Sequence, residues 1–289
     1  MPELPEVEVV KRSLTNKIQN LIIKEVKIND HRLRYPINKN QIRKIVGLKL
    51  KKIKRRSKFL LFFFNKDVTM LVHLGMTGKF FFINKKDTKF KTSFYYDINN
   101  EKDKKHDRVV FFLNKNQKLI YNDVRKFGFI KFFNNKNINN NIHLNNLGPE
   151  PLGQEFNYTY FKKYITGRNR AIKDIIMDQK FVSGIGNIYA NEVLFLSKVK
   201  PTRKVETLKN FELKKIIKFT KSVLKSSIKL GGSSIKDFSS SNGKKGSFQQ
   251  HFKVYGKKNE LCSNKNCKNK IIRSTISNRS TFFCSKCQK

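Results

Sequence analysis

The sequence predicts an α+β protein built from more than one domain, and three observations support this. Short β-type runs fill the first half of the chain, helical patterns follow them, and every cysteine lies within residues 247–289. Strands and helices that are separated along the chain are typical of the α+β class. A chain of 289 residues is long enough for two domains that each bury their own core.

The first helix is predicted over residues 3–20, because four apolar residues there recur at helical spacing. These are Val7, Val10, Leu14 and Ile18. The stretches that follow are rich in Phe, Val and Ile and are separated by polar clusters and glycine, a pattern typical of short strands. They cover residues 21–28, 48–54, 59–64, 69–74, 79–83, 90–97, 108–113, 118–121 and 127–133. Such strands indicate a sandwich or a barrel. We predict that residues 1–133 form such a sandwich or barrel, with a short helix at about 39–46.

Residues 134–151 are predicted to be a linker, because Asn dominates their first part and Gly148-Pro-Glu-Pro151 ends them. Residues 152–246 are predicted to be a helical domain that ends in a mobile loop rich in Ser, Gly and Lys, residues 233–246. Its helices are expected at about 155–166, 171–177, 187–197 and 207–230. Residues 247–289 are predicted to form a separate cysteine-containing module.

The chain is strongly basic, with a formal net charge of +42 and a pI near 10.2. So large a charge favours a polyanionic partner such as nucleic acid, although part of it reflects a composition crowded with Lys, Asn, Ile and Phe. The acidic opening argues against a signal peptide, and the longest apolar run, Phe59–Phe64, is too short to cross a membrane. We therefore expect a cytoplasmic protein with no membrane partner.

The opening residues, Met1-Pro-Glu-Leu-Pro-Glu-Val-Glu8, offer a candidate nucleophile. Removal of Met1 would leave Pro2 with a free secondary amine. A chain-terminal amine has a pKa near ~7.7–8.0, so part of it is neutral at physiological pH and can form a Schiff base. The iminium of a secondary amine is positively charged without a proton, which makes it an electron sink. Taken alone, these residues also fit an ordinary helix start with no catalytic role, because proline and glutamate are common in the first turn of a helix.

The cysteines follow the pattern C-x4-C, sixteen residues, then C-x2-C. They are Cys262, Cys267, Cys284 and Cys287. Two close pairs separated by a hairpin-sized gap are typical of a structural zinc site, in which four thiolates complete the tetrahedron. Two disulfides are the alternative, which a cytosolic setting disfavours. We predict one structural Zn²⁺ held by these four residues.

The PELPEVE opening resembles that of the formamidopyrimidine-DNA glycosylase family, bacterial enzymes that excise oxidised purines. Other strings resemble the family's motifs in the same order, so the resemblance extends from Pro2 to Lys289. They are Arg55–Leu61, His73–Gly78, Lys105–Asp107, Asn122–Gly128, Gly167–Lys173, Gly184–Glu192, Gly231–Ser234, Val254–Lys257 and Asn278–Cys284. The resemblance implies a catalytic helix on an N-terminal β-sandwich, a helix–two-turns–helix element in the helical domain and a zinc-finger β-hairpin.

Four residues are expected to be catalytic by this resemblance. Pro2 is the nucleophile, and Glu3 is the acid that handles protons at the sugar. Lys58 contacts a DNA phosphate and assists catalysis. Arg279 grips the phosphates that flank the lesion.

Further residues are expected to contact DNA by the same resemblance. Met76, Arg125 and Phe127 would fill the space that an everted base leaves, because eversion requires something to replace the lost stacking and pairing. We therefore expect these three side chains to be exposed. The other implied contacts are His106, Arg168, Lys173, Asn187 and Tyr255. Two features depart from the family: Lys257 stands in place of an arginine, which weakens a bidentate phosphate contact, and C-x4-C stands in place of C-x2-C.

The implied function is that of a bifunctional DNA glycosylase and abasic-site lyase of base excision repair. It would remove 8-oxoguanine and formamidopyrimidines from double-stranded DNA through a Schiff base on Pro2, followed by β- and δ-elimination. We expect a monomer that associates with the nucleoid through DNA. Two alternatives stay open. One is an enzyme like endonuclease VIII, which uses the same amine chemistry on oxidised pyrimidines, and the other is a zinc-containing DNA-binding protein without catalysis.

Overall fold

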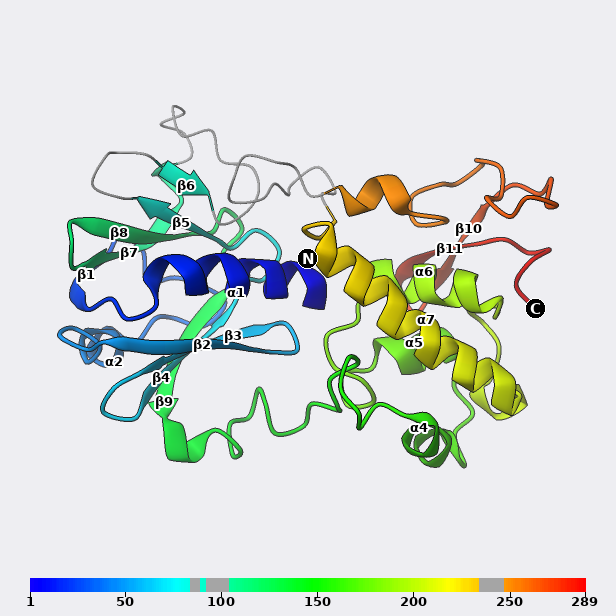
Figure 1. The fold of residues 1–289 in the computed structure, drawn as a ribbon, viewed down its shortest axis with the longest axis horizontal. Helices are drawn as coiled ribbons and strands as arrows, with labels where there is room; N and C mark the ends of the chain where they lie inside the picture. Colours follow the sequence, from blue (N-terminus) through cyan, green and yellow to red (C-terminus); the bar gives the residue numbers. More distant parts are fainter. Residues whose placement is uncertain (84–88, 92–103, 234–246) are drawn as a thin grey trace. The chain divides into compact units, whose positions relative to one another are not determined.

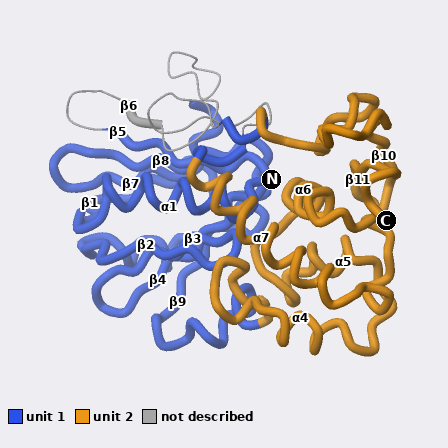
Figure 2. The backbone as a smooth tube through the Cα atoms, turned by 45° about the vertical axis from the view of Figure 1, so that its right-hand side comes forward, with its two compact units in different colours: residues 1–145, 230–249 blue, residues 146–229, 250–289 orange. Residues whose placement is uncertain are grey.

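The computed structural model describes residues 1–83, 89–91, 104–233 and 247–289, and the chain divides into two compact units (Figure 2). The first unit contains residues 1–145 and 230–249, and the second contains residues 146–229 and 250–289. The first unit is thus completed by a segment that follows the helices of the second. Of the predicted mobile loop only Ser233 is described, and of the predicted strand 90–97 only residues 90 and 91.

The first unit contains two antiparallel sheets, and the predicted β-sandwich is confirmed (Figure 1). In spatial order, one sheet consists of β1 (Ile23–Ile28), β7 (Asp107–Leu113), β8 (Gln117–Asn122), β5 (Lys79–Ile83) and β6 (Lys89–Lys91). The other consists of β2 (Leu50–Arg56), β3 (Phe59–Phe64), β4 (Val68–His73) and β9 (Phe129–Asn134). The phenylalanine-rich runs form strands because aromatic and branched side chains pack well on a pleated, half-buried surface.

The helices α1 (Leu4–Ile18) and α2 (Lys39–Arg43) belong to this unit. Figure 1 shows α1 alongside strands of both sheets. Its apolar stripe is buried in one core with phenylalanines from both sheets, among them Phe62, Phe64, Phe80, Phe82 and Phe111. Burying one such side chain stabilises the fold by ~1.5–3 kcal/mol, so the stripe holds α1 on the sandwich. The helix α2 is shorter than predicted, because the chain leaves it through tight turns and reaches Gly47 with φ +80°.

The second unit contains the four predicted helices and the predicted hairpin, with ends shifted by a few residues. They are α4 (Tyr158–Ile165), α5 (Ile172–Met177), α6 (Asn187–Ser197), α7 (Asn210–Lys229), β10 (Ile272–Ile276) and β11 (Arg279–Phe283). The helix α4 begins at Tyr158 because Asn157 caps it: the Asn157 side chain accepts the N–H of Tyr160 at 3.0 Å. A short 3-10 helix of this unit is Val205–Thr207. Another, Asn135–Asn137, lies in the first unit, and a third, Phe248–His251, lies where the chain passes from the first unit to the second.

Among the described helices, none has the length and apolar character needed to span a bilayer.

Candidate active site and nucleic-acid contacts

The predicted nucleophile Pro2 and the predicted acid Glu3 lie at the start of α1. Met1 is exposed, whereas Pro2 and Glu3 are buried. Glu3 is the residue before the first helical turn, and its backbone N–H donates to Glu6 Oε2 at 2.8 Å. This is the reciprocal contact of a capping box, which satisfies an N–H that the helix itself leaves unbonded. Pro2 is therefore held directly before a well-defined helix start, with the buried Glu3 next to it in sequence.

Glu6 has a second contact that sequence reasoning did not identify. Its Oε1 accepts both the backbone N–H and the hydroxyl of Ser233, each at 2.9 Å. Gly232, which precedes this serine, has φ +82°, a conformation that favours glycine. The buried Glu6 carboxylate thus attaches residues 232 and 233 to the start of α1, although they follow in sequence after the helical domain. The capping-box position of Glu6 was the available signal, but it does not reveal the distant partner.

Lys58 lies in the two-residue turn between β2 and β3, at the predicted strand junction. It is buried, with 7% of its surface exposed, and is therefore not an ordinary surface lysine. Arg55 fixes this turn: its guanidinium donates to the Ser57 carbonyl at 3.0 Å and to Glu8 Oε2 on α1 at 3.0 Å. Burial would raise the pKa of Glu8, but Arg12, Lys11 and Arg55 outweigh it and lower that pKa. The Glu8 carboxylate therefore stays ionised and joins the Lys58 turn to α1.

The three predicted void-filling residues are exposed, as expected. Met76 has 41% and Phe127 45% of its surface exposed, and Arg125 is exposed as well. The Arg125 guanidinium carbon lies 4.6 Å from the centre of the Phe127 ring, a cation–π contact. All three side chains are therefore accessible to a partner, as an insertion role requires.

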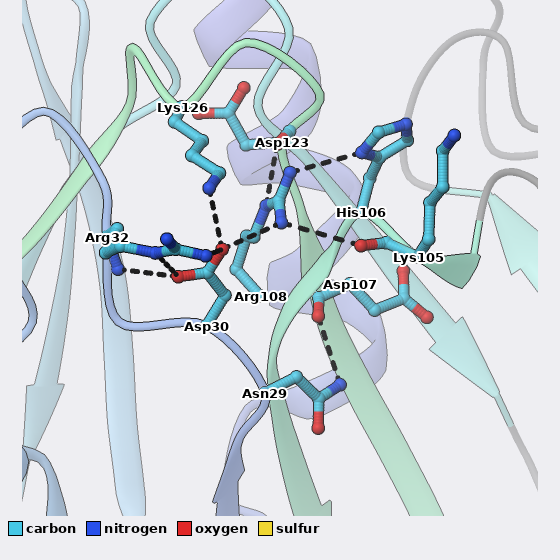
Figure 3. A network of polar contacts seen from close by, with 9 residues as sticks. All are labelled: Asn29, Asp30, Arg32, Lys105, His106, Asp107, Arg108, Asp123 and Lys126. Atoms are coloured by element: carbon cyan, nitrogen blue, oxygen red, sulfur yellow. Dashed lines mark hydrogen bonds and ion pairs between the residues drawn. The ribbon is translucent and has the colours of Figure 1, made fainter.

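His106 lies in an open, basic hollow of about 720 Å³ on the first unit (Figure 3). The centre of its network is Asp30, which accepts from Lys126 Nζ at 2.7 Å, from Arg32 Nε at 3.0 Å and from Arg108 at 3.2 Å. The hydrogen bonds from Arg32 and Lys126 hold the pKa of Asp30 well below its usual range. Arg108 also lies 3.1 Å from the His106 ring nitrogen. The Asp30 carboxylate therefore neutralises part of the positive charge around His106, a predicted DNA contact.

In the second unit, two predicted DNA-contacting residues, Lys173 and Asn187, bond to the hairpin strand that carries Arg279. Asn187, the first residue of α6, donates to the Ser280 carbonyl at 2.9 Å. Lys173 is 1% exposed, and its ammonium donates to the Thr281 hydroxyl at 2.6 Å, which in turn donates to the Arg279 carbonyl at 3.0 Å. Burial and the nearby Arg279 charge lower the pKa of Lys173 to about 8, against the opposing charge of Asp174. The Lys173 ammonium thus faces the backbone of the hairpin, whereas Arg279 itself is exposed.

Tyr255 is positioned by a buried acid that sequence reasoning left without a role. The Glu192 carboxylate on α6 accepts the backbone N–H groups of Lys253, Val254 and Tyr255 at 2.8, 3.0 and 2.8 Å. Burial raises the pKa of Glu192 and outweighs the lowering effect of these hydrogen bonds. The sequence signal for this role of Glu192 was that it is a single acidic residue in the mainly apolar helix α6. The remaining predicted contact, Arg168, is exposed, and its guanidinium carbon lies 4.4 Å from the centre of the Tyr164 ring.

The four cysteine sulfurs lie within 4.8 Å of one another. The Sγ atoms of Cys262 and Cys287 are 3.8 Å apart, and those of Cys267 and Cys284 are 3.6 Å apart. These distances exceed the ~2.05 Å of a disulfide and match the ~3.8 Å edge of a tetrahedron whose metal–sulfur bonds measure ~2.3 Å. The longer first knuckle closes through the N–H of Cys267, which donates to the Asn264 carbonyl at 2.9 Å. The four thiols can therefore hold a metal ion.

Comparison with known proteins agrees with this geometry. The family model of the formamidopyrimidine-DNA glycosylase N-terminal domain matches residues 1–130, and that of its H2TH domain matches residues 147–239. The chain belongs to the formamidopyrimidine-DNA glycosylase family. The formamidopyrimidine-DNA glycosylase of Rickettsia felis is 38% identical over 288 residues, which cover 100% of this chain and 98% of that protein. The formamidopyrimidine-DNA glycosylase of Roseobacter denitrificans is 35% identical over 289 residues and is covered completely.

Solved structures of formamidopyrimidine-DNA glycosylase, or Fpg, bound to DNA resemble the whole chain. The complex of Lactococcus lactis Fpg with an abasic site containing DNA has a TM-score of 0.85 at 31% identity, over 99% of each chain. The complex of the wild-type protein with N7-benzyl-Fapy-dG containing DNA also has a TM-score of 0.85 at 31% identity, over 100% of each chain. A third complex, with the same TM-score and identity, contains an oxidised pyrimidine in the DNA. The Lactococcus lactis protein thus binds DNA with several kinds of damage.

Removing the charge of Asp30 tests whether the hollow around His106 faces DNA. Asp30→Asn should tighten binding to undamaged duplex, because Lys126 and Arg32 lose their shared counterion and can engage phosphates instead. The slope of log affinity against log salt should steepen by up to about one unit, as measured by fluorescence anisotropy at several salt concentrations. Glu25→Gln is the matched control, since it changes the net charge equally at an exposed position of β1. Equal affinities of the two variants would show that the hollow does not face DNA.

Proposed function

We propose that this chain, a DNA glycosylase by family, releases oxidised purines from duplex DNA and then cleaves the resulting abasic site. The observation that carries the proposal is the start of α1, where Pro2 and a buried Glu3 lie directly before the first helical turn. Relatives named formamidopyrimidine-DNA glycosylase over the full length of the chain support the substrate class.

The reaction begins when the Pro2 nitrogen, freed by the removal of Met1, attacks C1′ of the damaged nucleotide. Glu3 supplies a proton to the sugar oxygen as the C1′–oxygen bond of the ring breaks, and the Pro2 nitrogen loses its own proton. The C1′–base bond then breaks, the bonding electrons leave with the base, which takes up a proton, and the nitrogen lone pair forms a cationic iminium at C1′. The iminium acidifies the C2′ proton, and loss of that proton expels the 3′ phosphate by β-elimination. A further δ-elimination expels the 5′ phosphate, and water releases the sugar fragment from Pro2.

The phosphates that leave require cations, and Lys58 and Arg279 are proposed to supply them. Lys58 is anchored through its turn to α1, and Arg279 projects from β11 in a strand fixed by Lys173 and Asn187. Preorganised positive charge stabilises a developing negative charge best, because no reorganisation is needed at the moment of reaction. The other proposed DNA contacts are Met76, His106, Arg125, Phe127, Arg168, Asn187 and Tyr255. For Lys173, a supporting role replaces the predicted DNA contact, because its ammonium is buried against the hairpin strand that carries Arg279.

We assign a function to each part of the chain on this basis. Residues 1–133 form the catalytic domain and residues 134–151 the linker. Residues 152–246 form the DNA-binding domain, whose predicted loop at 233–246 would surround the damaged base, and residues 247–289 form the zinc hairpin. The metal proposed for the four cysteines is one structural Zn²⁺, because a closed set of four thiolates leaves no position for substrate. The enzyme is proposed to act as a monomer on damaged double-stranded DNA in the cytoplasm.

Glu3→Gln tests the proposed acid. Base release from an 8-oxoguanine duplex should fall by ~10²–10⁴-fold in single turnover, because the amide cannot donate the proton at neutral pH. Binding to the same duplex should change little, since the side chain keeps its size. Base release from a duplex with an oxidised pyrimidine, measured in parallel, separates the proposed substrate from that of an endonuclease VIII-like enzyme. Excision by the variant within a few-fold of wild type would remove Glu3 from the mechanism.

Cys284→Ser tests the structural metal. The variant should lose zinc and bind DNA more weakly, because so short a hairpin has little core of its own and Arg279 lies on its second strand. Elemental analysis and duplex binding are measured on the same preparation, with Ser285→Ala, an exposed neighbour, as the control. A folded, active wild-type preparation without zinc would contradict the assignment.

Met76→Ala tests the void-filling role, and Met70 on β4 provides the matched control. Met70 is 2% exposed, so Met70→Ala should lower the free energy of unfolding by ~2–5 kcal/mol. Met76→Ala should melt within a few degrees of wild type but release 8-oxoguanine slowly, because everting a base costs a few kcal/mol that inserted side chains offset. Melting and single-turnover release are measured on each variant. If Met76→Ala instead had a much lower melting temperature and normal excision, Met76 would be a core packing residue and not a void-filling one.

A further inference from the structure

The exposed residues Met76, Arg125 and Phe127 lie on two separate loops that a single hydroxyl joins. We call residues 74–78 the Met76 loop and residues 123–128 the Phe127 loop. The Thr77 hydroxyl donates to Asp123 Oδ1 at 2.5 Å and accepts the backbone N–H of Arg125 at 3.0 Å. One side chain of the Met76 loop therefore fixes both the first residue of the Phe127 loop and the backbone that carries Arg125.

Asp123 completes this connection from the interior. It is fully buried, and its second carboxylate oxygen accepts the Gly128 N–H at 2.8 Å and faces the Tyr121 hydroxyl at 3.5 Å. Burial and the Asp123 charge raise the pKa of Tyr121, so the phenol stays protonated and can donate. A carboxylate is costly to bury unless hydrogen bonds satisfy it. Here those bonds come from both loops and from β8, so moving either loop would leave the buried charge with fewer partners.

The backbones of the two loops are also packed directly against each other. Gly75 has φ +62°, and a Cβ at this position would lie 2.4 Å from the backbone nitrogen of Gly128. A Cβ on Gly128 would lie 1.9 Å from the Tyr121 hydroxyl. No side chain fits between the two loops at Gly75, and none fits between the Phe127 loop and Tyr121 at Gly128. The glycines therefore allow the close packing in which the Thr77 hydrogen bonds form.

The Phe127 loop has one residue in an unfavourable conformation, and further contacts hold it there. Lys126 has φ +58°, a left-handed conformation that is rare for residues other than glycine, asparagine and aspartate. Its ammonium is held by Asp30 at 2.7 Å, and Arg108 donates to the Asp123 carbonyl at 2.9 Å (Figure 3). Such conformations persist when the surroundings over-determine them. The loop is therefore fixed at several points while Arg125 and Phe127 project outward from it.

We propose that Thr77 and Asp123 are positioning residues that lock the Met76 loop and the Phe127 loop into one preformed unit. The inference rests on the proposed function, since it takes base eversion as the step that the unit serves. Three side chains must enter the duplex together when the damaged base leaves the stack. If the loops moved independently, they would lose conformational entropy during insertion, and this free-energy cost would oppose eversion. We call the hydrogen bonds of Thr77 to Asp123 and Arg125 the clamp. Because the clamp orders both loops in the free protein, this cost does not arise when DNA is bound.

Thr77→Val and Thr77→Ser form the matched pair that tests the clamp. Valine keeps the shape of threonine but removes both hydrogen bonds, whereas serine keeps the hydroxyl. Base release from an 8-oxoguanine duplex in single turnover should slow by about tenfold or more in Thr77→Val and stay within about threefold of wild type in Thr77→Ser. Affinity for undamaged duplex should not change in either variant, because neither removes a cation.

Amide hydrogen exchange of residues 123–128 in the free protein gives a readout that does not depend on catalysis. Thr77→Val should speed exchange at Arg125 and Gly128, and Thr77→Ser should restore slow exchange. Base release at the wild-type rate by Thr77→Val, or equal slowing in both variants, would overturn the proposal. A wild-type protein that releases no damaged base would contradict the proposed function instead, and the exchange result would then decide whether the clamp exists.

Discussion

Packing of α1 into the β-sandwich is the interaction on which the proposed chemistry depends. A chain terminus is normally the least ordered part of a domain, yet here it carries the candidate nucleophile. The apolar stripe of the helix lies in one core with residues of both sheets, and Glu8 joins it through Arg55 to the turn that carries Lys58. Glu6 connects the first turn to Ser233. The buried residues further along α1 therefore fix the position of Pro2.

Buried polar groups hold the other functional side chains in the same way. Glu192 gathers three backbone N–H groups at Tyr255, Lys173 supports the strand of Arg279, and Asp123 joins two loops of the sandwich. Each of these groups lies in the interior of its unit, whereas the residue that it positions lies partly or fully at the surface. A buried polar group is stable only in the geometry that satisfies its hydrogen bonds. Such groups therefore favour one arrangement of the surface residues over alternatives of similar packing.

The helices and strands were predictable from the sequence because they follow from local patterns, whereas the exposure of the void-filling residues was predicted from the family resemblance. Helical spacing located α1 and the four later helices, and phenylalanine-rich runs located the strands. The burial of Lys173 was not predictable, because a lysine in a basic string carries no signal of the hairpin that covers it. Contacts between distant residues were missed for the same reason: Glu6 and Ser233 are 227 positions apart, and Thr77 and Asp123 are 46 apart. No periodicity connects such pairs.

The central claim is that the Pro2 amine forms a covalent bond to the damaged nucleotide. Borohydride reduction during reaction with an 8-oxoguanine duplex tests it most directly, because the hydride converts the iminium into a stable amine that links protein to DNA. Digestion and mass spectrometry of the trapped complex should place the adduct on a peptide that begins at Pro2 and lacks Met1. An active enzyme that gives no adduct, or an adduct on a lysine such as Lys58 in protein that retains Met1, would contradict the account.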